Sequence, residues 1–216
     1  MKDLWSVIEN QVFNVVSTAD LFNPYSSINA DVDVEAASVI RRENLRRYIF
    51  DHDKGVDLLL IAEAPGPWGC RFSGVPITSE SQLLDPDFPL SGRQSSRREK
   101  PYSEYSAGIY WRLLSPYYGS IFTWNTVPLH PHHVNNPLSI RTPRQIEINR
   151  FLPVLEAIVR FFNPKIILAV GRKAENALVR IGANARYVRH PSQGGARLFE
   201  AGIREVIGEL NLLPSH

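Results

Sequence analysis

The chain has 216 residues, 44% of them apolar and 10% aromatic, which is enough to bury one hydrophobic core of ordinary domain size. Its 24 Lys and Arg nearly balance 22 Asp and Glu, and a net charge of +2 excludes a histone-like polybasic chain. One cysteine, Cys70, excludes a disulfide framework, an all-cysteine zinc site and a four-cysteine iron–sulfur cluster. No apolar run approaches the ~20 residues that span a bilayer, and the start MKDLWSVIEN has no apolar signal core. We expect a soluble protein of a reducing compartment, cytoplasmic and nucleoid-associated when bound to DNA.

The first fifty residues are predicted to be mainly helical. Apolar residues recur at a period near 3.6 between Leu4 and Val16, and Asn23-Pro24 then breaks the pattern. A second helix is expected from about Val34 to Phe50. Four of its arginines are expected on the solvent side: Arg41, Arg42, Arg46 and Arg47. We treat the chain as one domain, with a helical part at 1–55 and a core at 56–212.

Short apolar runs predict the strands. They lie at 57–62, 120–125, 165–171 and, more weakly, 185–189. Continuous apolar runs of this length are typical of strands buried on both faces, as in parallel sheets covered by helices.

Helical patterns separate these runs. They lie at 143–162, with Thr142 as the N-cap and Pro143 at the first helical position, at 172–181 and at 195–212. Strands that alternate with helices predict a three-layer α/β/α sandwich around a parallel sheet. The Ser-, Pro- and Arg-rich stretch 78–112 is expected to be an excursion on the surface.

Each predicted strand ends in a polar or tightly turned residue. Glu63 follows the first strand, Asn125 ends the second, Gly171 ends the third and His190 follows the fourth. In open α/β sheets the functional groups gather beyond the carboxyl ends of the strands. We therefore expect an acid, an amide and an imidazole at one edge of the sheet.

Three segments in this order resemble the motifs of the uracil-DNA glycosylase superfamily. Ala62-Glu63-Ala64-Pro65-Gly66 resembles the first motif in the form used by the iron–sulfur branch. The segment from Asn125 through Arg141-Thr142-Pro143 to Ala174 is similar to the middle section of that branch, and His190-Pro191-Ser192 resembles the last motif. The resemblance covers roughly residues 56–199. It implies a three-layer sandwich with a four-stranded parallel sheet and hydrolytic release of a damaged base flipped out of DNA.

The resemblance also implies a role for each matching residue. Asn125 reads the base, since an amide offers a donor and an acceptor side by side. His190 stabilises the leaving base as it becomes an anion, and Glu63 positions or activates water near the sugar. The main chain of Ala64, Pro65 and Gly66 lines the sugar and the base. No cofactor and no metal are implied.

The chain departs from the iron–sulfur branch in several places. The cluster cysteines are missing, so packing must hold the corresponding loops. That branch has an aromatic residue where Ile77 ends Gly74-Val75-Pro76-Ile77, so either Phe72 stacks on the base or Ile77 covers it by apolar contact. The best-known branch has a Tyr at the position of Gly66 that excludes the thymine methyl; here another residue, with Trp68 as a candidate, must exclude it.

Two segments are predicted to contact DNA. The first supplies cations for phosphates: Arg93, Arg97, Arg98 and Lys100. The second follows the last motif: Ser192, Gln193, Gly194 and Arg197. Relatives often place a bulky apolar wedge in the second segment, and here Gln193 or Arg197 is expected to fill the gap left by the flipped base.

Three histidines, His130, His132 and His133, raise the question of a metal, but adjacent histidines around a proline point apart. We expect them in a loop that lines the DNA face. The predicted partner is DNA with uracil or another deaminated base, or abasic DNA, bound by a monomer and without a membrane. Two alternatives remain open: a protein that binds abasic or single-stranded DNA without turnover, and a hydrolase of nucleosides or other small molecules.

Overall fold

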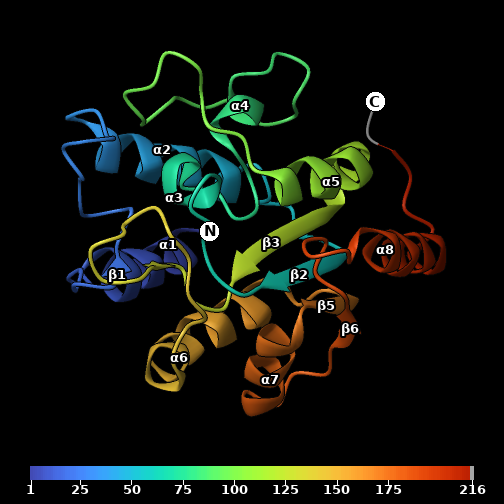
Figure 1. Cartoon of the computed structure of the whole chain (residues 1–216). Coiled ribbons are helices and arrows are strands. Elements are labelled where there is room, and N and C mark those ends of the chain that lie inside the picture. Colours follow the sequence, from blue (N-terminus) through green and yellow to red (C-terminus); the bar gives the residue numbers. More distant parts are fainter. Residues whose placement is uncertain (215–216) are drawn as a thin grey trace.

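A four-stranded parallel sheet forms the centre of the computed structural model, which describes residues 1–214 (Figure 1). The strand order is β3-β2-β5-β6, and every neighbouring pair is parallel. The strands are β2 (Leu58–Ala62), β3 (Ile121–Asn125), β5 (Ile166–Val170) and β6 (Arg186–Val188). All four coincide with the predicted apolar runs. A short antiparallel pair, β1 (Leu21–Phe22) with β4 (His130–Pro131), was not predicted.

Helices cover both faces of this sheet, as Figure 1 shows. Helices α6 and α7 lie on one side together with α1, and α2, α5 and α8 lie on the other. Their bounds are α1 Lys2–Ile8, α2 Ala37–Phe50, α3 Cys70–Ser73, α4 Glu80–Leu83, α5 Tyr105–Leu114, α6 Gln145–Phe162, α7 Arg172–Arg180 and α8 Ala196–Leu210. A π-helix at Glu9–Phe13 follows α1, and a 3₁₀-helix at Ser115–Ser120 precedes β3. The predicted three-layer α/β/α class is confirmed.

Aromatic packing joins the layers. Phe122 of β3 stacks on Tyr48 of α2 at 4.8 Å between ring centroids and lies 4.3 Å from Phe162 of α6. On the same side as α2, Tyr110 of α5 lies 5.7 Å from Phe199 of α8. Rings this close add to the free energy gained by burying apolar area. Within residues 1–214, no helix combines the length and apolarity that a membrane crossing requires.

Helix α6 begins two residues later than predicted. Its N-cap is Arg144 rather than Thr142, because the main-chain N–H of Arg144 donates to the carboxylate of Glu147 at 2.7 Å. This contact satisfies a donor at the helix start that Thr142 was expected to satisfy. Pro143 therefore precedes the helix.

The stretch 78–112 is only in part the surface excursion that its composition predicted, since most of residues 84–100 lie at the surface but both ends of the stretch are buried. The buried carboxylate of Glu80 accepts hydrogen bonds from the main-chain N–H groups of Ser95 (2.6 Å) and Ser96 (2.9 Å). These contacts fold the stretch back on itself, and α5 at its end packs against the sheet through Tyr110, which bonds Thr123. Polar residues such as Glu80, Ser95 and Ser96 can be buried here because they hydrogen-bond with one another.

Candidate active site

The carboxyl ends of the four strands bring the predicted polar residues to one edge. Strand register places Ala62 opposite Asn125, so Glu63 follows directly beside the amide. A Cβ added to Gly171 would lie 3.9 Å from Cβ of His190, which places His190 over the end of β5. Neighbouring strands are about 4.8 Å apart, so Asn125 and His190 flank Glu63 across about 10 Å. The predicted convergence at this edge is thus present.

Glu63 is half-buried in the loop that follows β2. Its carbonyl accepts the N–H of Val127 at 3.0 Å, which fixes the loop against the chain after β3. Burial raises the pKa of the Glu63 carboxyl, and the positive charge of Lys173 acts in the opposite direction. Within the described residues its carboxylate has no hydrogen-bond partner. The carboxylate is therefore free to hold a water molecule.

The ring of His190 is held in one tautomer. The main-chain N–H of Ser192 donates to Nδ1 at 3.1 Å, and the Ser192 hydroxyl also lies 2.7 Å from Nδ1. Burial lowers the pKa of His190, and the charge of Arg189 lowers it further, so the ring is neutral at neutral pH. An Nδ1 that accepts leaves the proton on Nε2. Ser192, predicted to contact DNA, thus orients the imidazole.

Asn125 is 2% exposed, and one atom of its amide is unpaired. Its Nδ2 donates to Sγ of Cys70 at 3.6 Å, whereas the buried Oδ1 has no partner among the described residues. Leaving a buried acceptor unpaired costs about 1–3 kcal/mol. This cost is typical of a site that completes its hydrogen bonds with a ligand.

One of the three histidines contacts the first-motif loop (62–66), and a second histidine packs against the first. His130 Nδ1 lies 2.8 Å from the carbonyl of Pro65, and His132 packs on His130 at 5.7 Å between centroids. Burial lowers the pKa of His130 to about 4. Both rings are buried and do not reach the surface of the loop, whereas His133 in the same loop is exposed. In the part of the chain that the structure describes, no group of His, Cys, Asp and Glu has the geometry of a metal site.

Phe72 is fully buried and has neither ring face free for a base. Tyr102 stacks on it at 4.1 Å, and the guanidinium of Arg71 lies 4.2 Å from its centroid. The expectation that Phe72 stacks on the base is therefore wrong for this conformation. Its alternative, Ile77, is half-buried beside the core.

Ile77 has an unusual backbone conformation, with φ of 45°. A β-branched residue rarely adopts positive φ, and such outliers cluster at functional sites. The Ile77 carbonyl accepts the indole N–H of Trp111 at 2.8 Å, which helps to hold this conformation. Ile77 is thus the residue that remains to cover a base.

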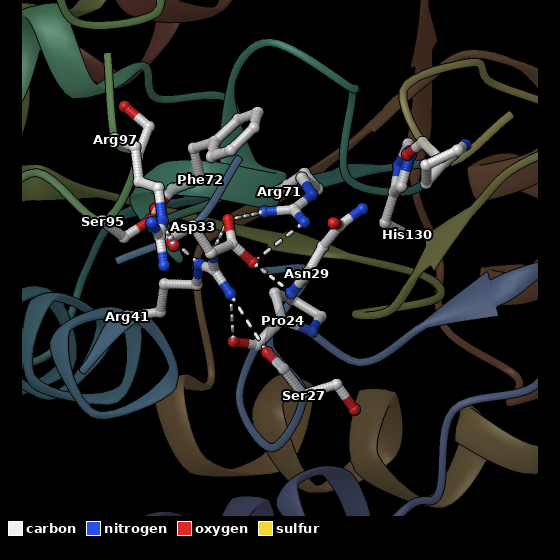
Figure 2. A network of polar contacts seen from close by, with 12 residues as sticks. Pro24, Ser27, Asn29, Asp33, Arg41, Arg71, Phe72, Ser95, Arg97 and His130 are labelled. Carbon is white, nitrogen blue, oxygen red and sulfur yellow. Dashed lines mark hydrogen bonds and ion pairs between the residues drawn. The ribbon is translucent and has the colours of Figure 1, made fainter. Parts of the chain in front are cut away.

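A buried network of charges holds α3 and the loops around it (Figure 2). Asp33 accepts two hydrogen bonds from Arg71 (2.6 and 3.0 Å) and forms an ion pair with Arg41 at 2.5 Å. Arg41 also donates to Ser95 at 3.0 Å. Burial acts to raise the pKa of Asp33, but the two arginines outweigh it and lower the pKa. The prediction that Arg41 faces solvent is wrong, because its partner Asp33 lies inside.

A second group of ion pairs ties the segment before α6 to β1. Arg141 donates to Glu147 at 2.9 Å and lies 3.4 Å from the carboxylate of Asp20. These ion pairs fix the segment before α6 against the chain at β1.

The four basic residues predicted to contact phosphates are all exposed. Arg97 donates from Nε to the carbonyl of Asp33 at 2.5 Å, so its guanidinium is partly engaged, and Arg98 lies over the ring of Tyr102 at 4.5 Å. Arg93 and Lys100 are the other two of these four residues, and both are exposed.

The loop after the last motif also faces solvent. Gln193 and Gly194 adopt positive φ (52° and 75°), and both are exposed together with Arg197. Next to Arg197, Leu198 is 66% exposed. The helical pattern at 195–212 does not indicate which face Leu198 occupies, so its exposure was not predicted.

Two hollows on the surface lie away from this edge. One is lined by α5 and α8, including Arg112 and Ile203, and the other lies near the amino ends of the strands, at Asp57 and Ser120. Neither includes Glu63, Asn125 or His190.

Comparisons with known proteins agree with the motifs and the fold. Residues 50–215 match the sequence model of the uracil DNA glycosylase superfamily, whose members are glycosylases and hence hydrolases. The crystal structure of wild-type SMUG2 from Pedobacter heparinus is similar, with a TM-score of 0.62 and 12% identity, over 96% of this chain and 98% of that chain. No curated protein sequence matches. Because the family model covers more than half of the chain, this protein belongs to the uracil-DNA glycosylase superfamily.

Proposed function

We propose that this protein is a DNA glycosylase that releases uracil, or a related deaminated base, by hydrolysis of the N-glycosidic bond and so starts base excision repair. The observation that carries the proposal is the hydrogen bond from the Ser192 N–H to Nδ1 of His190, which leaves the ring proton to Nε2, at the same sheet edge as Glu63 and Asn125. We further propose that it works as a monomer in the cytoplasm, associated with the nucleoid when bound to DNA.

Recognition of the base falls to Asn125. A base inside the stack cannot be reached, so it is extruded into the site. The Asn125 amide then donates from Nδ2 to a carbonyl of the base and accepts the adjacent N–H at Oδ1. This interaction supplies the partner that Oδ1 lacks in the protein alone.

Bond cleavage falls to His190 and Glu63. As the bond between C1′ and the base breaks, the sugar becomes oxocarbenium-like and the base leaves as an anion. The Nε2–H of His190 donates to the base oxygen on which negative charge develops. Glu63 accepts a proton from the water whose oxygen bonds to C1′, and its charge opposes the positive charge of the sugar.

Binding to the DNA backbone falls to the exposed cations. Arg93, Arg98 and Lys100 lie on one loop, and Arg197 lies at the start of α8. Neutralisation of phosphates supplies most of the non-specific affinity for DNA and makes that affinity fall with salt.

The test incubates the protein with single- and double-stranded oligonucleotides that carry uracil, hypoxanthine or xanthine and measures alkali-labile abasic sites. We expect release of at least uracil, loss of release in His190→Ala, and no effect of Glu156→Gln on the exposed face of α6. Absence of release from all three bases overturns the catalytic proposal.

A second candidate function is binding of abasic or single-stranded DNA without turnover. The burial of Asn125 favours it, because the amide is only 2% exposed in this conformation. Gel-shift affinity for an abasic analogue, without release of any base, is the result expected of this candidate.

A further inference from the structure

A second carboxylate, that of Glu104, lies at the same edge of the sheet. Glu104 immediately precedes α5, and its Oε1 accepts the hydroxyl of Ser106 at 2.6 Å. Its Oε2 is buried and has no hydrogen-bond partner in residues 1–214. Burial raises the pKa of Glu104, while the Ser106 hydroxyl and the nearby main-chain N–H groups of Trp68 and Gly69, which lie close to the carboxylate without the geometry of a hydrogen bond to Oε2, lower it. A carboxylate in this condition has an acceptor available to a ligand.

The Glu104 carboxylate lies directly against the backbone of Gly66 and Gly69, at the end of the first-motif loop and just after it. A Cβ added to Gly66 would lie 2.2 Å from Oε2, and one added to Gly69 would lie 2.6 Å from it. Carbon and oxygen atoms do not approach so closely without a bond. Gly66 and Gly69 therefore leave room for the carboxylate, and any side chain at position 66 has to displace it.

Glu104 is connected to the base-reading amide through Cys70. Asn125 Nδ2 donates to Sγ of Cys70, and Cys70 directly follows Gly69. Burial raises the pKa of the Cys70 thiol, and the nearby charge of Glu104 raises it further. Asn125, Cys70 and Glu104 thus form one continuous side of the site, and both unpaired oxygens, Asn125 Oδ1 and Glu104 Oε2, belong to it.

The proposed function sets how a pyrimidine lies against this side. O2 is the carbonyl next to N1, where the bond breaks, so it is turned toward His190, which lies over the end of β5, while N3 and O4 are left to Asn125 at the end of β3. The Asn125 Nδ2 that donates to O4 is the atom turned toward Cys70. The neighbour of C4 in the ring is C5, which therefore faces the Cys70 and Glu104 side.

We propose that Glu104 is a specificity-determining residue that lines the base pocket beside C5. A methyl group there covers the unpaired oxygen without giving it a hydrogen bond, so thymine is rejected. A hydroxymethyl group donates to the same oxygen, so 5-hydroxymethyluracil is accepted. This assignment rests on the proposed function. It also replaces the expectation that Trp68 excludes the methyl group, since Trp68 is 40% exposed and packs on Tyr102.

The first test compares the release of uracil, thymine and 5-hydroxymethyluracil, each opposite guanine, by the wild type, Glu104→Gln, Glu104→Ala and the control Glu156→Gln. In Glu104→Ala the thymine-to-uracil ratio should rise about 10- to 100-fold, the range that one methyl group spans in an apolar pocket. Glu104→Gln keeps the size of the side chain, so it should still reject thymine while its preference for the hydroxymethyl base changes.

Two results overturn the assignment. Unchanged ratios in both variants show that Glu104 does not line the pocket, and an equal gain for all three bases shows that it merely blocks the entrance. Failure of the wild type to release uracil counts against the proposed function instead. In that case dissociation constants of the three oligonucleotides replace the release rates. Unchanged ratios of these constants, or an equal change for all three bases, then overturn the assignment in the same way.

A second test does not depend on activity. Gly66→Ala should lower the melting temperature of the wild type, because the new Cβ collides with the Glu104 carboxylate, and should lower it much less in Glu104→Ala. Equal shifts in both backgrounds contradict the placement of the carboxylate.

Discussion

Two regions of this molecule contain buried or half-buried acidic side chains whose pKa values are shifted in opposite directions. Around Asp33, two arginines and the N–H of Asn29 complete the hydrogen bonds of the carboxylate, and its pKa is lowered despite burial. At the sheet edge, burial raises the pKa values of Glu63 and Glu104, and Glu104 keeps an oxygen unpaired. In the first region the hydrogen bonds of the carboxylate hold segments of the chain together, whereas in the second region an acceptor oxygen remains available to a substrate.

The difference concerns the carboxylates, because Arg71 Nε in the first region is also buried without a hydrogen-bond partner among the described residues. A buried carboxylate with its partners in place stabilises one conformation, and removal of one partner is strongly destabilising. A buried acceptor without a partner lowers stability by about 1–3 kcal/mol. The two regions should therefore respond to mutation in different ways.

The largest effect is expected at the structural region. Asp33→Asn leaves Arg41 and Arg71 buried without an anion, so the free energy of unfolding should fall by about 3–5 kcal/mol in urea titrations. Glu200→Ala, which breaks an exposed pair with Arg204, should change it by less than about 1 kcal/mol. Equal losses in the two variants would contradict the structural role of the Asp33 network.

At the functional region, His190→Ala should reduce the rate of base release about 10²- to 10³-fold, because a donor to the leaving base is lost. The melting temperature should fall much less than in Asp33→Asn, since the hydrogen bonds of the ring within the described residues are confined to Ser192. Single-turnover release of uracil and thermal melting measure the two effects. A large loss of stability with an unchanged rate of base release would show that His190 is a structural residue and not a functional one.

The raised pKa of Glu63 predicts an acid limb in the pH profile. Glu63 has to be ionised to accept a proton, so kcat/KM should fall about tenfold per pH unit as pH drops below that raised pKa. In Glu63→Gln the remaining activity should lose the acid limb; its persistence assigns the titration to another group.

The smallest effects are expected at the exposed cations. Arg98→Ala should weaken DNA binding about equally for all sequences and reduce the slope of log K against log salt by about 1. Arg97→Ala should reduce the slope less, because its guanidinium already donates to the carbonyl of Asp33. Fluorescence anisotropy at several salt concentrations measures both, and an unchanged slope in Arg98→Ala removes this loop from the DNA interface.

Much of the fold was predictable from local patterns. The four strands are apolar runs that match a sheet buried on both faces, and polar residues at their ends had to meet because parallel strands end at the same edge. The site residues Glu63, Asn125 and His190 are therefore placed by features within a few positions of each. Leu198 and the late start of α6 lacked such a local signal.

The sequence by itself determined the strands, their alternation with helices and the convergence of an acid, an amide and an imidazole, because these depend on burial patterns and on strand direction. Only the tertiary structure decided that Arg41 is buried, that Phe72 is covered on both faces and that Glu104 occupies the space beside Gly66. Each of these outcomes depends on partners distant in sequence, namely Ser95 for Arg41, Tyr102 for Phe72 and Gly66 for Glu104. Local composition carries no signal for such pairs, since the free energy of burying a charge or a ring is set by what it meets in space.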